Sequence, residues 1–219
     1  MKRPEYVALA IRNINSLHFY NPTHKVKVYV DAICKKAFLS RKKDIDYPNT
    51  VECVEFFSNK NQPWQYMKIE ALIEASKQSA YLVDADTRWF ADPVVSDKKM
   101  TFLVFANYVD DNQMERNLIT SVFHKKKWGV YGHYVSGFVS IPQRFMTLNL
   151  KQKLRAYVRK IYENTEGETR RLSEELAISY AVQSLYLKRQ ITTLKASDGP
   201  GDRHIMQSMY YGCSNRIIT

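Results

Sequence analysis

The sequence Ala80-Tyr-Leu-Val-Asp-Ala-Asp86 decides the expected fold. Its first four residues form an apolar run suited to a buried strand, and this strand leads directly into Asp84 and Asp86. Strand-like and helix-like segments alternate before it, which predicts an α/β domain with a mostly parallel central sheet flanked by helices. Ligands of such sheets bind at the carboxyl ends of the strands, where this acidic pair is expected. Strands are expected at residues 6–11, 26–30, 51–57, 80–83 and 191–194, and helices at 32–39 and 64–77.

Length and composition favour a single domain. The chain has 219 residues, of which 45% are hydrophobic, enough for one well-packed core and short for two. The three cysteines, Cys34, Cys53 and Cys213, are far apart and lack zinc-ligand spacing, so they are expected to be reduced thiols. The apolar run at residues 6–11 is much shorter than the roughly 20 residues of a membrane span. A cytoplasmic protein without signal peptide, anchor or membrane span is expected, or a soluble domain of a longer chain.

The net charge points to an anionic partner. The sequence has 33 basic and 22 acidic residues, which gives a formal charge of +11. This balance is typical of proteins that bind nucleic acid, acidic lipid or phosphorylated small molecules, and it does not choose among them. The basic residues form short scattered groups, most of which are expected on solvated surface loops.

Two aspartates at positions i and i+2 after a strand suit a metal site. Carboxylate oxygens are preferred ligands of hard cations such as Mg²⁺ or Mn²⁺, and substrate phosphate can complete the coordination shell. An Asp-x-Asp pattern alone is common, and a solvated turn explains most instances. The surrounding sequence therefore decides how the pair is interpreted.

That surrounding sequence resembles the donor-binding core of GT-A-fold, DxD-containing nucleotide-sugar glycosyltransferases of the small viral and bacterial type. In this family a helix with a basic residue, as in Tyr66-Met-Lys-Ile-Glu-Ala-Leu72, precedes a strand that ends in the acidic motif. Val135-Ser-Gly-Phe-Val-Ser-Ile141 resembles the acceptor-side strand, and Ser173-Glu-Glu-Leu-Ala-Ile-Ser-Tyr180 the acidic helix start after it. The resemblance implies one Rossmann-type, GT-A-like domain over residues 1–219. Its nucleotide-sugar-binding half would cover about residues 1–95, and its acceptor-side half about 96–219.

The resemblance also implies roles around the acidic motif. Asp86 matches the firmer metal ligand, and Asp84 matches the aspartate that contacts the metal or the ribose, with Ala85 between them in the donor site. Lys68 would meet the diphosphate or the uracil; an exposed helix lysine is the alternative. His204, in a late loop rich in glycine and proline, would be a third metal ligand, although the fuller histidine motif of the glycogenin-like enzymes is missing.

The nucleoside and the acceptor have candidate residues of their own. The loop after the first expected strand, with Arg12 and Asn13, would receive the nucleoside, and Ala8 would line the base pocket. Glu174 and Glu175 are the candidates for a catalytic base, since an inverting enzyme needs a carboxylate near the acceptor hydroxyl. Acidic residues are also favoured in a first helical turn by the helix dipole, so the stereochemistry stays open.

The resulting prediction is a metal-dependent glycosyltransferase of the hexosyltransferase type. It would move a sugar from a UDP-sugar to a hydroxyl of a glycan or glycoprotein, with Mn²⁺ or Mg²⁺ as cofactor and no nucleic-acid partner. A nucleic-acid-binding module is the first alternative, based on the charge and 15 tyrosines, but no recognisable reader motif is present. A Mg²⁺-dependent nucleotidyltransferase is the second, although the loop after the first expected strand, residues 12–15, contains no glycine.

Overall fold

The computed structural model describes residues 6–56, 62–93, 95–105, 122–123, 134–196 and 206–208. The chain divides into two compact units, which are described separately. The first comprises Met1–Gln62, Val83–Val94 and Ala196–Thr219, and the second Pro63–Leu82 and Val95–Lys195. Among the described residues, no helix is long and apolar enough to cross a membrane. The division into a donor half and an acceptor half near residue 95 stays a prediction.

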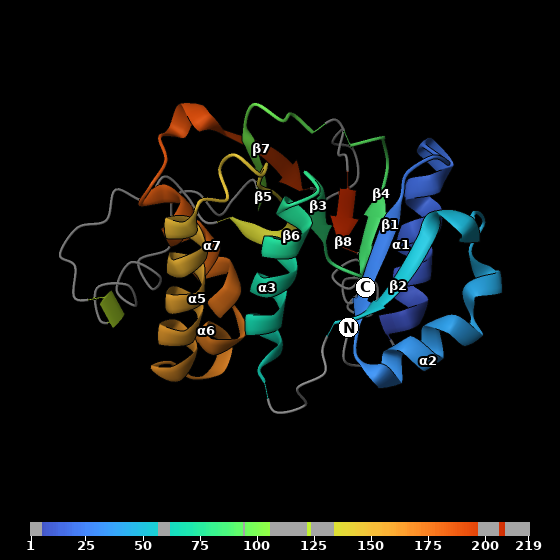
Figure 1. Ribbon diagram of the computed structural model, residues 1–219, viewed down its shortest axis with the longest axis horizontal. Coiled ribbons are helices and arrows are strands. Elements are labelled where there is room, and N and C mark those ends of the chain that lie inside the picture. Colours follow the sequence, from blue (N-terminus) through green and yellow to red (C-terminus); the bar gives the residue numbers. More distant parts are fainter. Residues whose placement is uncertain are drawn as a thin grey trace, which may run out of the picture. The chain divides into compact units, whose positions relative to one another are not determined.

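The first unit combines two long helices with two small sheets (Figure 1). Strands β1 and β2 are parallel, with Val26 opposite Val51 and Val30 opposite Glu55. Helix α2 connects them, as expected for a βαβ unit. Strands β4 and β8 form an antiparallel pair. The elements are α1 (Tyr6–Tyr20), β1 (Val26–Val30), α2 (Ala32–Ser40), the 3₁₀ turns η1 (Lys42–Asp44) and η2 (Pro48–Thr50), β2 (Val51–Glu55), β4 (Thr87–Trp89) and β8 (Met206–Ser208).

The prediction of a strand at residues 6–11 is wrong, because these residues form the beginning of helix α1. A short apolar run cannot be assigned to a strand or a helix from periodicity alone. The longer segment shows the helical spacing of three and four, and its apolar residues face the core of this unit together with Phe38, Ile45 and Val51. The buried apolar positions of α1 are Val7, Ala10, Ile11, Ile14 and Leu17.

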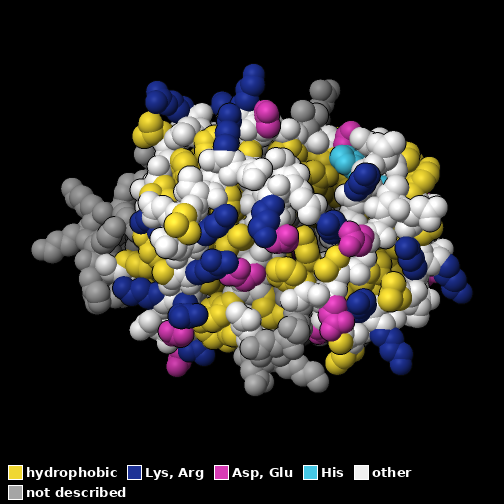
Figure 2. Space-filling view, viewed as in Figure 1, with side chains coloured by type: hydrophobic (Ala, Val, Ile, Leu, Met, Phe, Trp, Pro, Cys, Tyr) yellow, Lys and Arg dark blue, Asp and Glu magenta, His cyan; other side chains and the backbone are white. Residues whose placement is uncertain are grey.

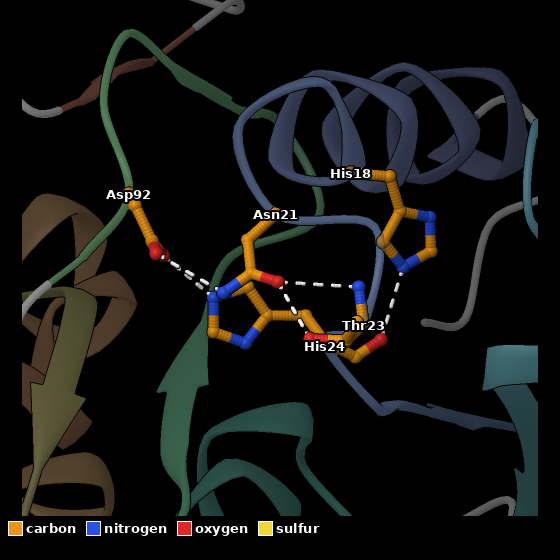
Figure 3. A network of polar contacts seen from close by, with 5 residues as sticks. All are labelled: His18, Asn21, Thr23, His24 and Asp92. Atoms are coloured by element: carbon orange, nitrogen blue, oxygen red, sulfur yellow. Dashed lines mark hydrogen bonds and ion pairs between the residues drawn. The ribbon is translucent and has the colours of Figure 1, made fainter.

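A polar network holds the segment between α1 and β1 against Asp92, which follows β4 (Figure 3). The Asp92 carboxylate accepts from Asn21 Nδ2 at 3.1 Å and from His24 Nε2 at 2.7 Å. Asn21 Oδ1 also accepts from the backbone N and the hydroxyl of Thr23, at 3.2 and 2.7 Å. The buried ring of His18 contacts the carbonyl of His24 through Nε2 at 3.1 Å. The network thus joins Asn21, which follows the end of α1, to Asp92, 71 residues further along the chain.

Replacing Asp92 by asparagine is expected to destabilise the protein in a pH-dependent way. The hydrogen bond from His24 holds the pKa of Asp92 below its ordinary value of 3.8. A carboxyl group with a lowered folded-state pKa contributes stability above its unfolded pKa, and loses it as pH falls through the folded value. At neutral pH the Asp92→Asn variant should be less stable by under about 1 kcal/mol, because the site is exposed. Thermal unfolding across pH should show this difference shrinking below 3.8 and vanishing below the lower pKa of the folded state; a difference that persists in acid would contradict the explanation.

The second unit is built on a four-stranded sheet in the order β3-β6-β5-β7. Helices α3, α5 and α7 and this sheet together form the apolar core of the unit. The helices of the unit are α3 (Trp64–Ser76), α5 (Leu148–Glu163), α6 (Gly167–Arg171), α7 (Ser173–Gln183) and the 3₁₀ turn η3 (Lys188–Gln190). The strands are β3 (Tyr81–Val83), β5 (Met100–Phe105), β6 (Val135–Ser140) and β7 (Ile191–Ala196).

The main sheet is mostly antiparallel, so the mostly parallel central sheet expected from the sequence is wrong. Strands β5 and β6 run in opposite directions, with Thr101 opposite Ser140 and Phe102 opposite Val139. A continuous apolar run indicates that a strand is covered on both faces, but it carries no information about the direction of the strand relative to its neighbours. The α/β class is confirmed, whereas a parallel pair occurs within the first unit as β1 and β2.

Helices α5 and α7 pack side by side (Figure 1). The buried face of α5 consists of Leu150, Leu154, Val158 and Ile161, spaced by three or four residues as in an amphipathic helix. Helix α7 begins at Ser173, with Leu172 as its N-cap residue. Glu174 and Glu175 lie in its first turn, as expected.

Candidate functional site

The acidic motif lies where the sequence placed it, directly after a strand. Strand β3 ends at Val83, and Asp84, Ala85 and Asp86 form a turn that leads into β4. The backbone N of Thr87 donates to the carbonyl of Asp84 at 3.2 Å, which closes the turn. All three turn residues are half-buried.

Asn13 on helix α1 fixes this turn from inside the first unit. Its Nδ2 donates to the carbonyl of Asp84 at 2.8 Å, and its Oδ1 accepts from Trp89 Nε1 at 2.8 Å. Ser16 adds two contacts, because its hydroxyl donates to the carbonyl of Asn13 and accepts from the backbone N of Trp89. Asn13 and Trp89 are both buried. These bonds form a clamp of Asn13, Ser16 and Trp89 that holds the start of the acidic turn at Asp84 and the end of β4 at Trp89.

Removing the indole N–H of Trp89 should therefore destabilise the first unit. The Trp89→Phe variant keeps an aromatic ring but leaves the buried Oδ1 of Asn13 without this donor, at an expected cost of about 1–3 kcal/mol. Urea denaturation measures the loss. Trp64→Phe is the control, because Trp64 is 43% exposed, and it should change stability by about 0.5 kcal/mol or less. Equal effects of the two substitutions would contradict the clamp.

The residues expected to receive the nucleoside all lie on helix α1. Ala8 is half-buried, Arg12 is exposed and Asn13 belongs to the clamp. Their role was inferred from a loop after a first strand, and this loop is part of the helix. The nucleoside contacts stay a prediction, and their strand-to-loop argument no longer applies.

Three other expected site residues meet in the second unit. Lys68 on α3 and Glu174 and Glu175 on α7 converge on the hydroxyl of Ser136 on β6. Lys68 Nζ donates to Ser136 Oγ at 2.7 Å and lies 3.7 Å from Glu174 Oε1. The distances from Ser136 Oγ to Glu174 Oε1 and Glu175 Oε1 are 3.1 and 3.0 Å. We call these four residues the Ser136 cluster.

The Ser136 cluster is largely shielded from solvent. The side chains of Lys68 and Glu174 are 13% and 2% exposed, and Ser136 is fully buried. Charges this deep require close partners, because burial without a partner costs several kcal/mol per ion. Ser136 is not among the site residues expected from the sequence. Its signal was the alternation in β6, which turns Ser136 and Phe138 to the same face of the strand.

The structure places two of the three expected metal ligands, Asp84 and Asp86, on one turn. Asp84 and Asp86 provide hard oxygen donors on one turn, which fits Mg²⁺ or Mn²⁺ with phosphate and water as further ligands. Within the described part of the chain, no group of three or more histidine, cysteine, aspartate or glutamate side chains is placed to hold a metal ion. His204 lies outside the described residues.

Comparisons with known proteins give loose similarity of fold to solved structures, without a matching family. No protein-family model matches the chain, and no curated protein matches it. Among solved structures, it is similar to the PaToxG glycosyltransferase, with 11% sequence identity and a TM-score of 0.44. The similarity covers 81% of this chain and 62% of the PaToxG chain. This chain therefore spans less than two thirds of the length of the PaToxG chain. At this TM-score the similarity concerns the course of the backbone and carries no information about activity.

Proposed function

We propose that the protein is a glycosyltransferase that uses a nucleotide-diphosphate sugar, with a UDP-sugar as donor and a glycan or glycoprotein hydroxyl as acceptor. The observation that carries the proposal is the Asp84–Asp86 turn after β3, held by the clamp of Asn13, Ser16 and Trp89. A turn fixed by buried hydrogen bonds presents its carboxylates without further ordering, as a binding site for a charged ligand requires.

Asp84 and Asp86 would hold a divalent ion at the donor diphosphate. When bound, such an ion neutralises the charge that develops on the leaving diphosphate. The two side chains would fix its position from the same turn. The structure shows this turn after β3, and the resemblance of the surrounding sequence to DxD-containing glycosyltransferases supports its role.

The Ser136 cluster would serve the acceptor side of the reaction. The acceptor oxygen forms a bond to the anomeric carbon while the bond from that carbon to the diphosphate oxygen breaks. In the inverting route a carboxylate of the cluster takes the acceptor proton, and the electron pair of the broken bond leaves with UDP. Glu174 and Glu175 are the groups proposed for this proton transfer.

Calorimetric titration of UDP and GDP, with and without Mn²⁺, tests the proposal. Binding of UDP that depends on Mn²⁺ is the expected result, with weaker binding of GDP. Absence of nucleotide binding under every metal condition would overturn the proposal.

The described residues on the face shown in Figure 2 do not favour the nucleic-acid alternative. On the face shown in Figure 2, lysine and arginine side chains are scattered among acidic and hydrophobic ones. Several basic residues are also committed to pairs, such as Arg155 with Glu70 at 2.6 Å. A strand-tracking groove would gather its basic residues along one path.

A further inference from the structure

The hydroxyl of Ser136 joins three charged side chains that come from two different helices. Lys68 reaches it from α3, and Glu174 and Glu175 reach it from neighbouring positions on α7. The three nitrogen and oxygen atoms lie 2.7 to 3.1 Å from Ser136 Oγ. Consecutive helix residues point in directions about 100° apart, so helix geometry alone does not direct two neighbouring glutamates to one hydroxyl.

The hydrogen count gives Ser136 a defined role. The ammonium of Lys68 donates to Oγ, so the hydrogen of the hydroxyl is available for a carboxylate. A hydroxyl has one hydrogen, whereas the two carboxylate oxygens lie at nearly equal distances of 3.1 and 3.0 Å. Ser136 therefore connects the positive charge of Lys68 to one carboxylate at a time.

The two glutamates differ in how deeply they are buried. Glu174 is 1% exposed and lies within ion-pair distance of Lys68, so it occupies the inner side of the cluster. Glu175 is only partly buried, while its carboxylate contacts the same hydroxyl. A group that takes a proton from a substrate hydroxyl must be accessible to that hydroxyl, and of the two glutamates Glu175 is the one with exposed surface for such a contact.

We infer that Ser136 is a positioning residue that orients the carboxylate of Glu175 toward the acceptor, whereas Glu174 and Lys68 anchor the buried side of the cluster. This inference rests on the proposed function. With water as acceptor, the water oxygen bonds to the anomeric carbon and the bond from that carbon to the diphosphate breaks. Glu175 takes the proton released from water, and UDP leaves with the electron pair.

The test is a double-mutant cycle on donor hydrolysis, measured as kcat and KM for UDP-glucose, UDP-galactose and UDP-N-acetylglucosamine with Mn²⁺. Ser136→Ala should lower kcat by roughly tenfold or more with little change in KM, since a positioned base contributes about 10²–10⁴-fold. In the Glu175→Gln background the same substitution should cause almost no further loss, because residues that act as one unit are non-additive. Ser136→Thr, which keeps the hydroxyl, should restore most of the activity.

A matched control separates positioning from stability. Ser140 is a buried serine on the same strand, outside the cluster, and Ser140→Ala should leave kcat unchanged. Thermal unfolding of every variant shows whether the fold is retained, and Ser136→Cys replaces Ser136→Ala in the cycle if the alanine variant does not fold.

The outcomes distinguish this inference from the proposed function. If the wild-type protein does not bind UDP in the presence of Mn²⁺, the proposed function fails, and the inference fails with it. UDP binding together with equal, additive losses of kcat in both backgrounds overturns the inference alone. If the protein binds UDP but hydrolyses none of the three UDP-sugars, the role of Ser136 in turnover is also overturned.

Discussion

Replacing Asp86 by alanine should abolish the Mn²⁺-dependent binding of UDP and leave the fold intact. The clamp holds the turn through the carbonyl of Asp84 and the side chains of Asn13 and Trp89, none of which the substitution removes. The carboxylate is the group expected to bind the metal ion, and its loss takes away one of only two acidic ligands on the turn. Calorimetry with UDP and Mn²⁺ should show affinity reduced by at least about 100-fold, an expected loss of roughly 2.7 kcal/mol.

The matched control is Asp46→Ala. Asp46 is an exposed aspartate of the same unit and lies outside the acidic turn, so its replacement removes the same charge without touching the clamp. This variant should bind UDP as the wild-type protein does. Full UDP binding by Asp86→Ala would remove the central claim of the proposed function, and equal losses in the two variants would point to net charge as the cause.

Replacing Lys68 by methionine should give the largest loss of stability among substitutions in the Ser136 cluster. Methionine keeps much of the side-chain length but removes the ammonium that faces Ser136 and Glu174. Breaking a buried ion pair from one side typically costs about 3–5 kcal/mol, because the remaining charge stays in the interior. We expect the free energy of unfolding, measured by urea denaturation, to fall by about 3 kcal/mol.

Lys77→Met, next to the end of the same helix, is the control for this substitution. Lys77 pairs with Glu74 at 2.6 Å, but their side chains are 56% and 36% exposed. Exposed pairs contribute about 0–1 kcal/mol, so this variant should be close to the wild-type protein. A loss below about 1 kcal/mol for Lys68→Met would contradict a buried charge that depends on this ammonium.

Local sequence patterns predicted the elements best where the pattern was long. The helix expected at residues 64–77 is α3, and the strand expected at 80–83 is β3 with the acidic turn behind it. The segment at residues 6–11 failed because six residues cover fewer than two helical turns, which is too short to distinguish the two periods. Strand direction in the main sheet failed because apolar content is the same in parallel and antiparallel strands that are covered on both faces.

The candidate site was predicted residue by residue, without its internal contacts. Lys68 is expected at the diphosphate or the uracil, and Glu174 and Glu175 are both candidates for the base. The structure brings all three together on Ser136, although the hydrogen bond from Lys68 to Ser136 spans 68 positions. The nucleoside role of Asn13 follows from its expected place in a loop after the first strand, whereas in the structure its amide oxygen accepts a hydrogen bond from Trp89, 76 positions away. Contacts of this range follow from topology, and a local pattern of side-chain types carries no signal for them.

The carbonyl oxygen of Asp84 has a further consequence for ligand chemistry. It accepts one hydrogen bond from the backbone N of Thr87 and another from Asn13 Nδ2. A carbonyl oxygen has two lone pairs, so both are committed within the folded chain. Main-chain coordination at this position is therefore closed to an incoming cation. Selectivity at the turn has to reside in the carboxylates, where a single substitution can change it while the peptide geometry stays the same.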